Sequence, residues 1–438
     1  MLPRAKVVIV DDDEHELKQL SEAFYNSGIP CLPLQYNSRD GVKRYGIEKS
    51  TDIRWLFIDI HLESGTNVEA ASLVGPIKEI ISHLIGRGIY SLVFWSKHAD
   101  KVEEIIARIK NDEDLSRNIP PPVSYACVDK NIFIEDATKL KEKIKSTLSE
   151  NRLVSSMLRW ENAVANASSN ILTKVHQLAK SNDSWEINET RENIKNIISL
   201  LAHEASGFER ARDDANVSLN RGLFSLVEDD YSNITKKDIW TGFEFTSEQQ
   251  LKQVPIDIKV KLNTYILTEE ITSDRNGGAL YEKGVISFID RKKTDINSLF
   301  GNADLDTIIK EEFIGFEKTV DLNSVILGII EVSPDCDHAN KKIKIHRFVL
   351  TSLIPSEYWS KKNKAQHDGI FNEIPNVLYK GKQYKLLLSF KYIISIPFSD
   401  GNMSMFECEA LRLKDDMLVK IRTEMARYIS RPGYTAIH

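Results

Sequence analysis

The stretch Lys6-Val-Val-Ile-Val-Asp-Asp-Asp13 decides the fold of the first third of the chain. An uninterrupted apolar run that ends in acids is typical of a strand buried on both faces of a sheet. Similar runs occupy Trp55–Ile58, Ser91–Trp95 and Val123–Val128. The segments between the runs carry apolar residues at helical spacing, as at Leu17, Leu20 and Phe24. Strands separated by helices predict a doubly wound α/β domain with a parallel sheet, which we place at residues 1–150.

Residues 151–238 carry no strand pattern. Apolar residues recur three or four positions apart along a first helix, at Met157, Trp160, Val164, Ala167, Ile171, Val175 and Leu178. Such a stripe fits either a coiled-coil seam, and hence a homodimer, or one face of a helical bundle. A turn is expected at Ser181–Ser184, before a second helical pattern over Ile194–Ala205. We interpret this segment as a helical connector.

From residue 239 onward the pattern changes to strands. Ile256–Leu262 alternates apolar and polar residues, while Val325–Val332, Ile343–Leu350 and Tyr384–Ile396 are extended apolar runs. A last amphipathic helix is expected over Met417–Ile429. Residues 239–438 are therefore predicted to form an α+β domain.

The composition narrows the class of protein. The 438 residues are 42% hydrophobic and 28% charged, and the net charge of −6 argues against nucleic acid as a partner. No stretch reaches the ~18 uncharged apolar residues that span a bilayer. The first residues show no apolar signal-peptide core, and the four cysteines are far apart in the sequence. We expect a cytoplasmic protein without membrane association.

Polar residues stand where the predicted core strands end. Asp11 and Asp12 follow the first strand, Asp59 the second, Ser96 the third and Lys130 the fourth. Ligands of open parallel sheets bind in the crevice outside the carboxyl ends of the strands. Carboxylates suit magnesium or can accept a phosphoryl group, which a lysine and a hydroxyl stabilise. The pattern predicts a site for phosphoryl transfer.

These residues resemble the receiver domains of two-component response regulators. Val8-Ile-Val-Asp-Asp-Asp-Glu14 is similar to the opening of that family, and Leu56-Phe-Ile-Asp-Ile-His-Leu62 to its acceptor strand. The resemblance implies that Asp59 is phosphorylated, with chemistry limited to self-phosphorylation and dephosphorylation. It also assigns roles to other residues: magnesium (Mg2+) is held by Asp11, Asp12, Asp59 and the carbonyl of His61, the phosphoryl oxygens are contacted by Ser96 and Lys130, and the following helix is N-capped by Asp13.

The family resemblance also implies partners. A receiver takes its phosphoryl group from a histidine kinase or a phosphotransfer protein. Atypical receivers joined to an α+β domain like this one resemble components of bacterial phosphorelays in antiviral defence, which implies a role as a phosphate sink or a regulator. In the position of the family's aromatic switch residue the chain has Cys127, with Tyr125 two residues earlier.

A second candidate site lies after the strand Val325–Val332. Asp335, Cys336, Asp337 and His338 follow it directly, and His346 is on the next strand. This group fits a metal or nucleophile site, or a tight turn with a small buried cysteine. As an enzyme, the chain would be a receiver-gated effector with a C-terminal hydrolase site around Cys336, Asp337 and His338.

Overall fold

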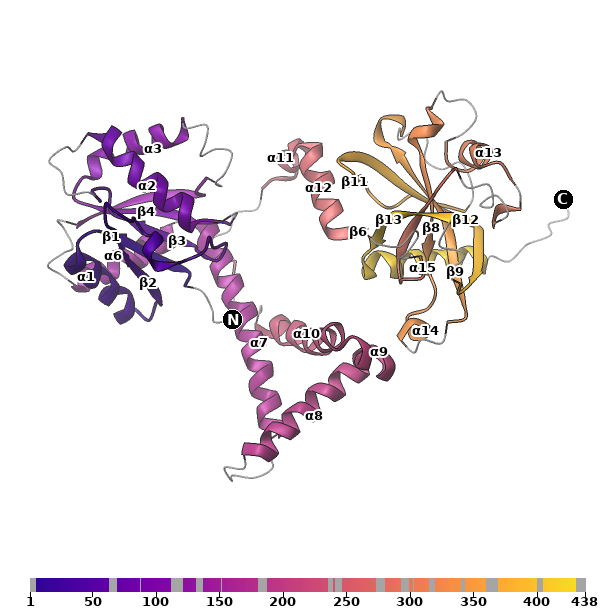
Figure 1. The fold of residues 1–438 in the computed structure, drawn as a ribbon, viewed down its shortest axis with the longest axis horizontal. Coiled ribbons are helices and arrows are strands. Elements are labelled where there is room, and N and C mark those ends of the chain that lie inside the picture. Colours follow the sequence, from indigo (N-terminus) through magenta and orange to yellow (C-terminus); the bar gives the residue numbers. More distant parts are fainter. Residues whose placement is uncertain are drawn as a thin grey trace. The chain divides into compact units, whose positions relative to one another are not determined.

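The chain forms two compact units in the computed structural model (Figure 1). Unit 1 comprises Met1–Thr173 and Val227–Phe245, and unit 2 comprises Lys174–Leu226 and Thr246–His438. The predicted connector, residues 151–238, is thus divided between the two units. The structure describes residues 5–62, 69–86, 88–111, 121–130, 137–150, 152–179, 187–234, 239–240, 246–272, 280–292, 299–301, 303–314, 320–339, 343–359, 369–399 and 405–430.

Unit 1 contains a five-stranded, all-parallel sheet with the strand order β2-β1-β3-β4-β5. Its strands and the helices between them are β1 Val7–Asp11, α1 Glu14–Asn26, β2 Cys31–Gln35, β3 Trp55–Ile58, α2 Ala70–Leu84, β4 Ser91–Ser96, α3 Val102–Lys110, β5 Ser124–Asp129 and α6 Ala137–Glu150, with 3-10 turns at Lys43–Tyr45 and Ala99–Lys101. The predicted parallel α/β layout is confirmed.

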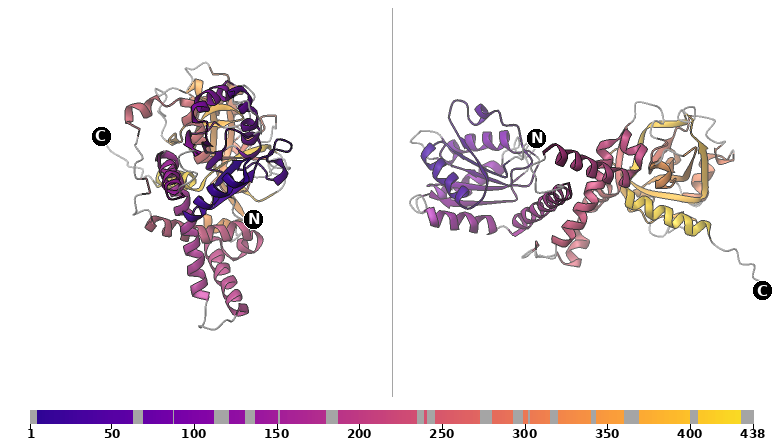
Figure 2. Two further views of the ribbon diagram at one scale, coloured as in Figure 1. Left: turned by 90° about the vertical axis from the view of Figure 1, so that its left-hand side faces the viewer. Right: turned by 90° about the horizontal axis from the view of Figure 1, so that it is seen from below.

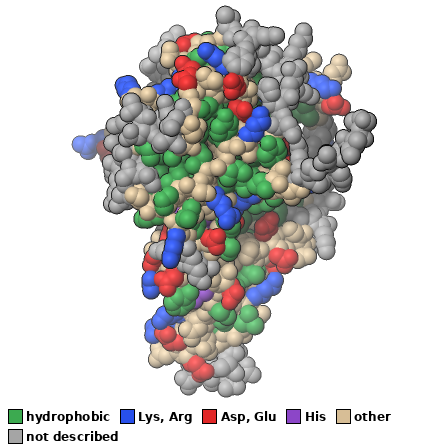
Figure 3. All heavy atoms as spheres, turned by 90° about the vertical axis from the view of Figure 1, so that its right-hand side faces the viewer, with side chains coloured by type: hydrophobic (Ala, Val, Ile, Leu, Met, Phe, Trp, Pro, Cys, Tyr) green, Lys and Arg blue, Asp and Glu red, His purple; other side chains and the backbone are tan. Residues whose placement is uncertain are grey.

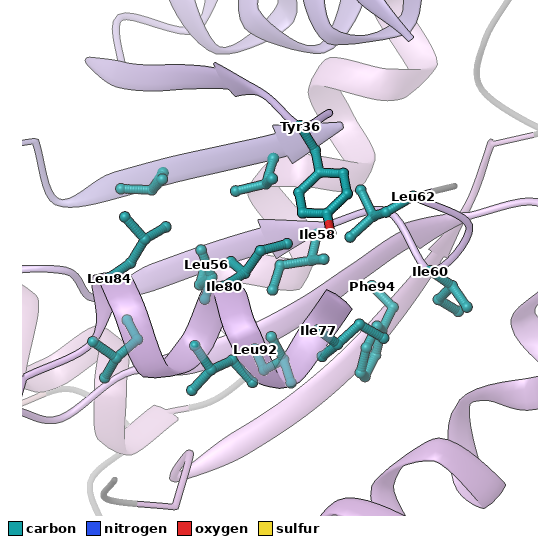
Figure 4. Packing of buried hydrophobic residues seen from close by; sticks show 14 of the residues in the cluster. Tyr36, Leu56, Ile58, Ile60, Leu62, Ile77, Ile80, Leu84, Leu92 and Phe94 are labelled. Carbon is teal, nitrogen blue, oxygen red and sulfur yellow. The ribbon is translucent and has the colours of Figure 1, made fainter. Parts of the chain in front are cut away.

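Helices cover both faces of this sheet (Figure 1). On one face, Ile77 and Ile80 of α2 pack against Leu56 and Phe94 of the central strands (Figure 4). On the other face, α1 and α6 contribute to a second apolar cluster that includes Phe57 of β3. Burial on both faces explains why these strands are uninterrupted apolar runs in the sequence.

Strand β2 was not predicted. Its sequence, Cys31-Leu-Pro-Leu-Gln35, contains a proline and is only partly buried. The strand lies at the edge of the sheet beside β1. Proline is tolerated at a sheet edge, where one side of the backbone has no neighbouring strand. An edge strand therefore lacks the continuous apolar pattern that identified the others.

Four helices follow the first sheet: α7 Arg152–Ala179, α8 Ile187–Ser206, α9 Phe208–Asp213 and α10 Ala215–Ile234. The predicted helices are confirmed, and the expected turn at Ser181–Ser184 lies outside the described residues. Of the predicted stripe on α7, Ala167, Ile171 and Val175 are buried within the chain, whereas Trp160 and Leu178 are 44% and 75% exposed. The buried part of the stripe therefore acts as a packing face within this chain.

Glu161 attaches α7 to the sheet of unit 1. Its Oε1 lies 2.5 Å from Nη2 of Arg54, and its Oε2 lies 2.8 Å from Nζ of Lys6. Burial raises the pKa of Glu161, but the hydrogen bonds from Arg54 and Lys6 outweigh burial and hold it below its usual value. An acid with a depressed folded-state pKa stabilises the fold above its unfolded-state pKa, and this stabilisation disappears as the pH falls.

We expect Glu161→Gln to lower the free energy of unfolding of unit 1 by about 1–2 kcal/mol at pH 7. The difference from the wild type should shrink as the pH falls below 4.5, the ordinary pKa of the group. Urea denaturation at pH 7 and pH 3 measures both values. Glu22→Gln, on the exposed side of α1, is the control and should change stability by less than about 0.5 kcal/mol. Equal differences at both pH values would contradict an ionic role for Glu161.

Unit 2 contains an eight-stranded sheet whose pairs are all antiparallel, with the order β10-β12-β9-β8-β7-β13-β6 and β11 paired to β12. From Thr246 onward its elements are α11 Glu248–Gln253, α12 Ile256–Leu267, β6 Thr268–Thr272, β7 Val285–Ile289, α13 Leu305–Ile308, β8 Ile326–Glu331, α14 Asp335–Ala339, β9 Ile345–Pro355, β10 Ile370–Phe371, β11 Val377–Tyr379, β12 Lys382–Pro397, β13 Phe406–Leu413 and α15 Asp415–Ile429, with a π-helical turn at Ile309–Ile314 and 3-10 turns at Leu322–Ser324 and Ser356–Tyr358.

Helical segments cover both faces of the second sheet. Leu418 and Ile421 of α15 pack into one apolar cluster, and Ile308 and Ile309 belong to the cluster on the other face. Figure 2 shows α15 lying along the sheet. The predicted α+β class is confirmed, as are the strands expected from the three extended runs and the last helix.

The strand predicted at Ile256–Leu262 is wrong, because the segment belongs to helix α12. Its alternation is not the pattern of a half-buried strand, since Ile256, Ile258 and Leu262 are more than half exposed and Val260 is buried. The helix contacts strand β11 through a polar residue: the backbone N–H of Leu378 donates to Thr264 Oγ1 at 2.7 Å.

On the face drawn in Figure 3, acidic and basic side chains are interspersed with hydrophobic ones. Among the described residues, no helix is long and apolar enough to cross a membrane.

Candidate functional site

The predicted site residues come from neighbouring strands of the parallel sheet. Asp11 is the last residue of β1, Asp59 follows β3, Ser96 is the last residue of β4 and Lys130 follows β5. These strands are adjacent and parallel, so their carboxyl ends meet at one edge of the sheet. The strand ends therefore bring acids, a hydroxyl and an ammonium group to the same edge, as the sequence predicts.

Lys130 joins the acids of this edge. Its Nζ lies 2.7 Å from Asp11 Oδ2, 2.9 Å from Asp59 Oδ2 and 2.6 Å from Glu16 Oε2. Lys130 is 1% exposed, and Asp11 is fully buried. A buried charge needs partners of opposite sign, and here one cation is shared by three carboxylates.

Glu16 was not predicted as part of the site. It lies on α1, whose first turn is held by Asp13: the side chain of Asp13 accepts from the backbone N–H groups of His15 at 2.8 Å and Glu16 at 3.0 Å. The predicted N-cap role of Asp13 is thereby confirmed. The cap fixes the first turn, which directs Glu16 toward the strand ends; its other oxygen, Oε1, is 2.6 Å from Nζ of Lys97. In the sequence Glu16 is one acid among several on a helix, and nothing marks it.

The acids of the site differ in their affinity for protons. Burial raises the pKa of Asp11 to about 7, and the charge of Asp59 contributes to the rise. The positive charge of Lys130 lowers this pKa but does not outweigh the two other effects. Burial also raises the pKa of Glu16, but its hydrogen bonds to Lys130 and Lys97 outweigh burial and hold it below its usual value. Burial lowers the pKa of Lys130, and the surrounding carboxylates more than reverse this, so the group stays charged at neutral pH.

The two oxygens of Asp59 have different surroundings. Oδ2 is paired with Lys130, while Oδ1 is buried and has no hydrogen-bond partner among the described residues. Ser96 is fully buried, and its Oγ accepts from the backbone N–H of His98 at 3.2 Å. Asp59 therefore offers one oxygen whose lone pairs are not engaged by the residues that the structure describes.

Asp12 and His61 lie beside this group. Asp12 is half-buried, and burial followed by the charge of Asp59 raises its pKa. His61 is half-buried, with its ring 6.0 Å from that of His98. Asp11, Glu16 and Asp59 each offer a carboxylate oxygen within 4.8 Å of the others, a group that could hold a metal ion. Of these three acids, Asp11 and Asp59 were predicted as metal ligands, and Glu16 was not.

The donor set suits magnesium, which prefers carboxylate oxygens. Oδ1 of Asp59 is a buried acceptor without a partner among the described residues, as expected for an atom that contacts a cation. Lys130 already supplies one positive charge to the acids in the same place. A bound cation would therefore share these carboxylates with the ammonium group.

The residues near the predicted switch position lie on β5. Cys127 is partly buried and packs against the apolar cluster under α2 and α3. Tyr125 is 37% exposed, and its hydroxyl donates to Glu103 of α3 at 3.0 Å. Tyr125 is thus attached to the helix next to its strand.

The second candidate site, the group of acids, cysteine and histidines after strand β8, does not have the contacts that a cysteine hydrolase needs. Cys336 is exposed, and its Sγ donates to Asp337 Oδ1 at 3.5 Å. His338 instead directs Nε2 to Glu331 Oε2 at 2.8 Å, and His346 directs Nδ1 to Glu331 Oε1 at 3.1 Å. The two histidines converge on a buried glutamate rather than on the cysteine.

Comparison of the chain with models of protein families found no match, and neither did comparison with curated proteins.

Proposed function

We propose that unit 1 is a receiver module that accepts a phosphoryl group on Asp59 and that the protein acts in two-component signal transduction. The observation that carries this proposal is the pair of unlike oxygens on Asp59: one is held by Lys130, and the other is buried without a partner among the described residues. A carboxylate held in this way can act as a nucleophile toward phosphorus.

The proposed step is a simple displacement. Oδ1 of Asp59 attacks the phosphorus atom of a phosphohistidine, a new O–P bond forms, the N–P bond breaks and the histidine nitrogen keeps the electron pair. The phosphoryl group brings a charge of about −2. Lys130 and the hydroxyl of Ser96, at the ends of β5 and β4, are placed to contact its oxygens, which stabilises charge that develops during transfer.

Magnesium is the cofactor that this donor set favours. Asp11, Asp12, Asp59 and the carbonyl of His61 are the residues that would hold it. When bound, the ion neutralises charge on the transferring group. Lys130 would then turn from the acids to the phosphoryl oxygens, because the cation takes over its role as counter-charge.

The proposed partner is a histidine kinase or a phosphotransfer protein of a bacterial phosphorelay. A receiver that takes up and loses phosphoryl groups can serve as a phosphate sink, and we place the protein in antiviral defence on the resemblance described above. A homodimer through α7 would use its exposed apolar residues, among them Trp160.

The test is incubation with magnesium and a small acyl phosphate, followed by intact mass measurement. The wild type should gain about 80 daltons, one phosphoryl group, and Asp59→Ala should gain nothing. Asp52→Ala, at an exposed aspartate of the same unit, should behave as the wild type, and chelation of magnesium should abolish the gain. An equal gain in Asp59→Ala would place the acceptor elsewhere, and no gain in the wild type would refute the proposal.

The alternative function is a receiver-gated hydrolase in unit 2. It requires Cys336 to act as the nucleophile, yet the ring nitrogen Nε2 of His338 is engaged by Glu331. Cys336→Ser separates the two proposals: it should leave phosphorylation of Asp59 unchanged, and it would abolish turnover if the hydrolase existed.

A further inference from the structure

We propose that unit 2 binds one divalent metal ion of the zinc class through Glu331, His338 and His346. This site is independent of the phosphoryl-acceptor site in unit 1. Glu331 is the last residue of β8, His346 is the second residue of β9, and His338 lies on α14 between the two strands. Strands β8 and β9 pair antiparallel, so the end of one and the start of the other are neighbours.

The donor atoms already form a compact group. Nε2 of His338 and Nδ1 of His346 contact the two different oxygens of Glu331, at 2.8 and 3.1 Å. One ligand atom from each residue lies within 4.8 Å of the other two. Zinc bonds of about 2.0–2.2 Å place neighbouring ligands roughly 3.3 Å apart, so small side-chain shifts admit the ion.

The charge states of the group suit a metal ion. Glu331 is fully buried, and burial raises its pKa, but the hydrogen bonds from His338 and Ser333 outweigh this effect and hold it low. Burial lowers the pKa of His346, which favours its neutral form. A metal ion needs deprotonated ligands: an ionised carboxylate and imidazoles that offer a lone pair.

Surrounding groups hold the ligands in place. The backbone N–H of Ser333 donates to both oxygens of Glu331 at 3.2 Å, and Oγ of Ser333 accepts from the backbone N–H of Arg347 at 2.9 Å. The ring of Tyr281 lies 4.8 Å from that of His346. Its hydroxyl donates to the carbonyl of Pro397 at 3.1 Å. Partners of this kind orient metal ligands and tune their affinity.

Asp335 and Cys336, which lie close to His338 in the sequence, are not part of this group of ligands. Asp335 pairs with Lys283 and Arg422, both at 2.8 Å, and Cys336 is exposed. Among the residues that the structure describes, the site therefore has three protein ligands, the number found in zinc sites of the two-histidine, one-glutamate type, whose remaining position takes water. Two imidazoles and one carboxylate favour zinc or cobalt over magnesium and calcium, whose sites are built from oxygen.

The experiment uses the full chain, stripped with a chelator and loaded with zinc in the presence of excess magnesium. Metal content after gel filtration should be one zinc per chain, and cobalt in its place should give the strong visible absorption of a four-coordinate site. His338→Ala should weaken zinc binding at least about 100-fold, because loss of a residue that only orients a ligand already costs about 10- to 100-fold.

Two controls keep the result specific. His176→Ala, at an exposed histidine of unit 2, and Asp11→Asn, in the acidic site of unit 1, should each keep one zinc per chain with unchanged affinity. If His338→Ala fails to fold, the wild type alone decides: zinc should raise its melting temperature, and a chelator should reverse the rise. The proposal is overturned if the stripped wild type takes up no zinc, or if His338→Ala folds and binds zinc as the wild type does.

Discussion

Lys130→Met should lower the free energy of unfolding of unit 1 by about 3–5 kcal/mol at pH 8, because it leaves three neighbouring carboxylates without their shared cation. Methionine is close to lysine in length and flexibility, so the change removes charge rather than packing. Without the ammonium group, which lowers the pKa of Asp11, burial and the charge of Asp59 raise that pKa further. An acid whose folded-state pKa is raised stabilises the fold below its unfolded-state pKa, and this stabilisation is lost as the pH rises.

The loss should therefore be small near pH 4 and complete above pH 7, the region in which Asp11 ionises. Millimolar magnesium should restore part of the stability at pH 8, since a ligand that binds the folded state stabilises it. Denaturant unfolding at pH 4 and pH 8, with and without magnesium, measures these effects. Lys97→Met is the control, because Lys97 is half exposed and contacts Glu16 alone among these acids; its effect should be below about 1 kcal/mol. A loss that is independent of pH and magnesium would refute the electrostatic explanation.

Glu16→Gln should lengthen the lifetime of the phosphoryl group on Asp59 by about tenfold. In the wild type, Oε2 of Glu16 forms an ion pair with Nζ of Lys130 at 2.6 Å. Glu16 therefore competes with a phosphoryl group on Asp59 for the ammonium group of Lys130. A hydrogen bond to a charged group is worth about 1.5–3 kcal/mol, enough for a factor of ten or more. The amide of glutamine keeps the shape of the side chain and removes its charge.

The measurement is the decay of the phosphorylated mass after removal of the phosphodonor. Glu14→Gln changes an exposed glutamate of the same helix and should leave the lifetime unchanged. A shorter lifetime in Glu16→Gln would mean that Glu16 positions Lys130 for the phosphoryl group instead of withholding it, and the competition described here would be wrong.

The first sheet was predictable because its central strands are buried on both faces. Apolar runs such as Trp55–Ile58 have no other simple explanation, and the acids that follow them mark the edge where ligands bind. Strand β2 escaped prediction because an edge strand carries no such run. Helix α12 was mistaken for a strand because its apolar residues alternate by chance while most of them face solvent.

The site itself was predictable in part. Asp11, Asp59, Ser96 and Lys130 are positioned by strand ends, which the sequence locates to within a residue. Glu16 reaches the same place from a helix. Glu331 meets His346 through the pairing of β8 with β9, and it meets His338 through helix α14 between those strands. Contacts that depend on the rotation of a helix or on the register of a neighbouring strand leave no local pattern in the sequence.

Helix α12 has a role that its small buried area conceals. The hydroxyl oxygen of Thr264 accepts a hydrogen bond from the backbone N–H of Leu378, and the side-chain amide of Asn263 donates to the carbonyl of Asn376 at 3.3 Å. These are backbone groups of the short outer strand β11 and the residue before it, which would otherwise be open to pairing with a strand of another molecule. By engaging these groups, helix α12 reduces what this edge offers to a strand of another molecule, and a hydrophobic substitution at Thr264 or Asn263 would release one of the two groups.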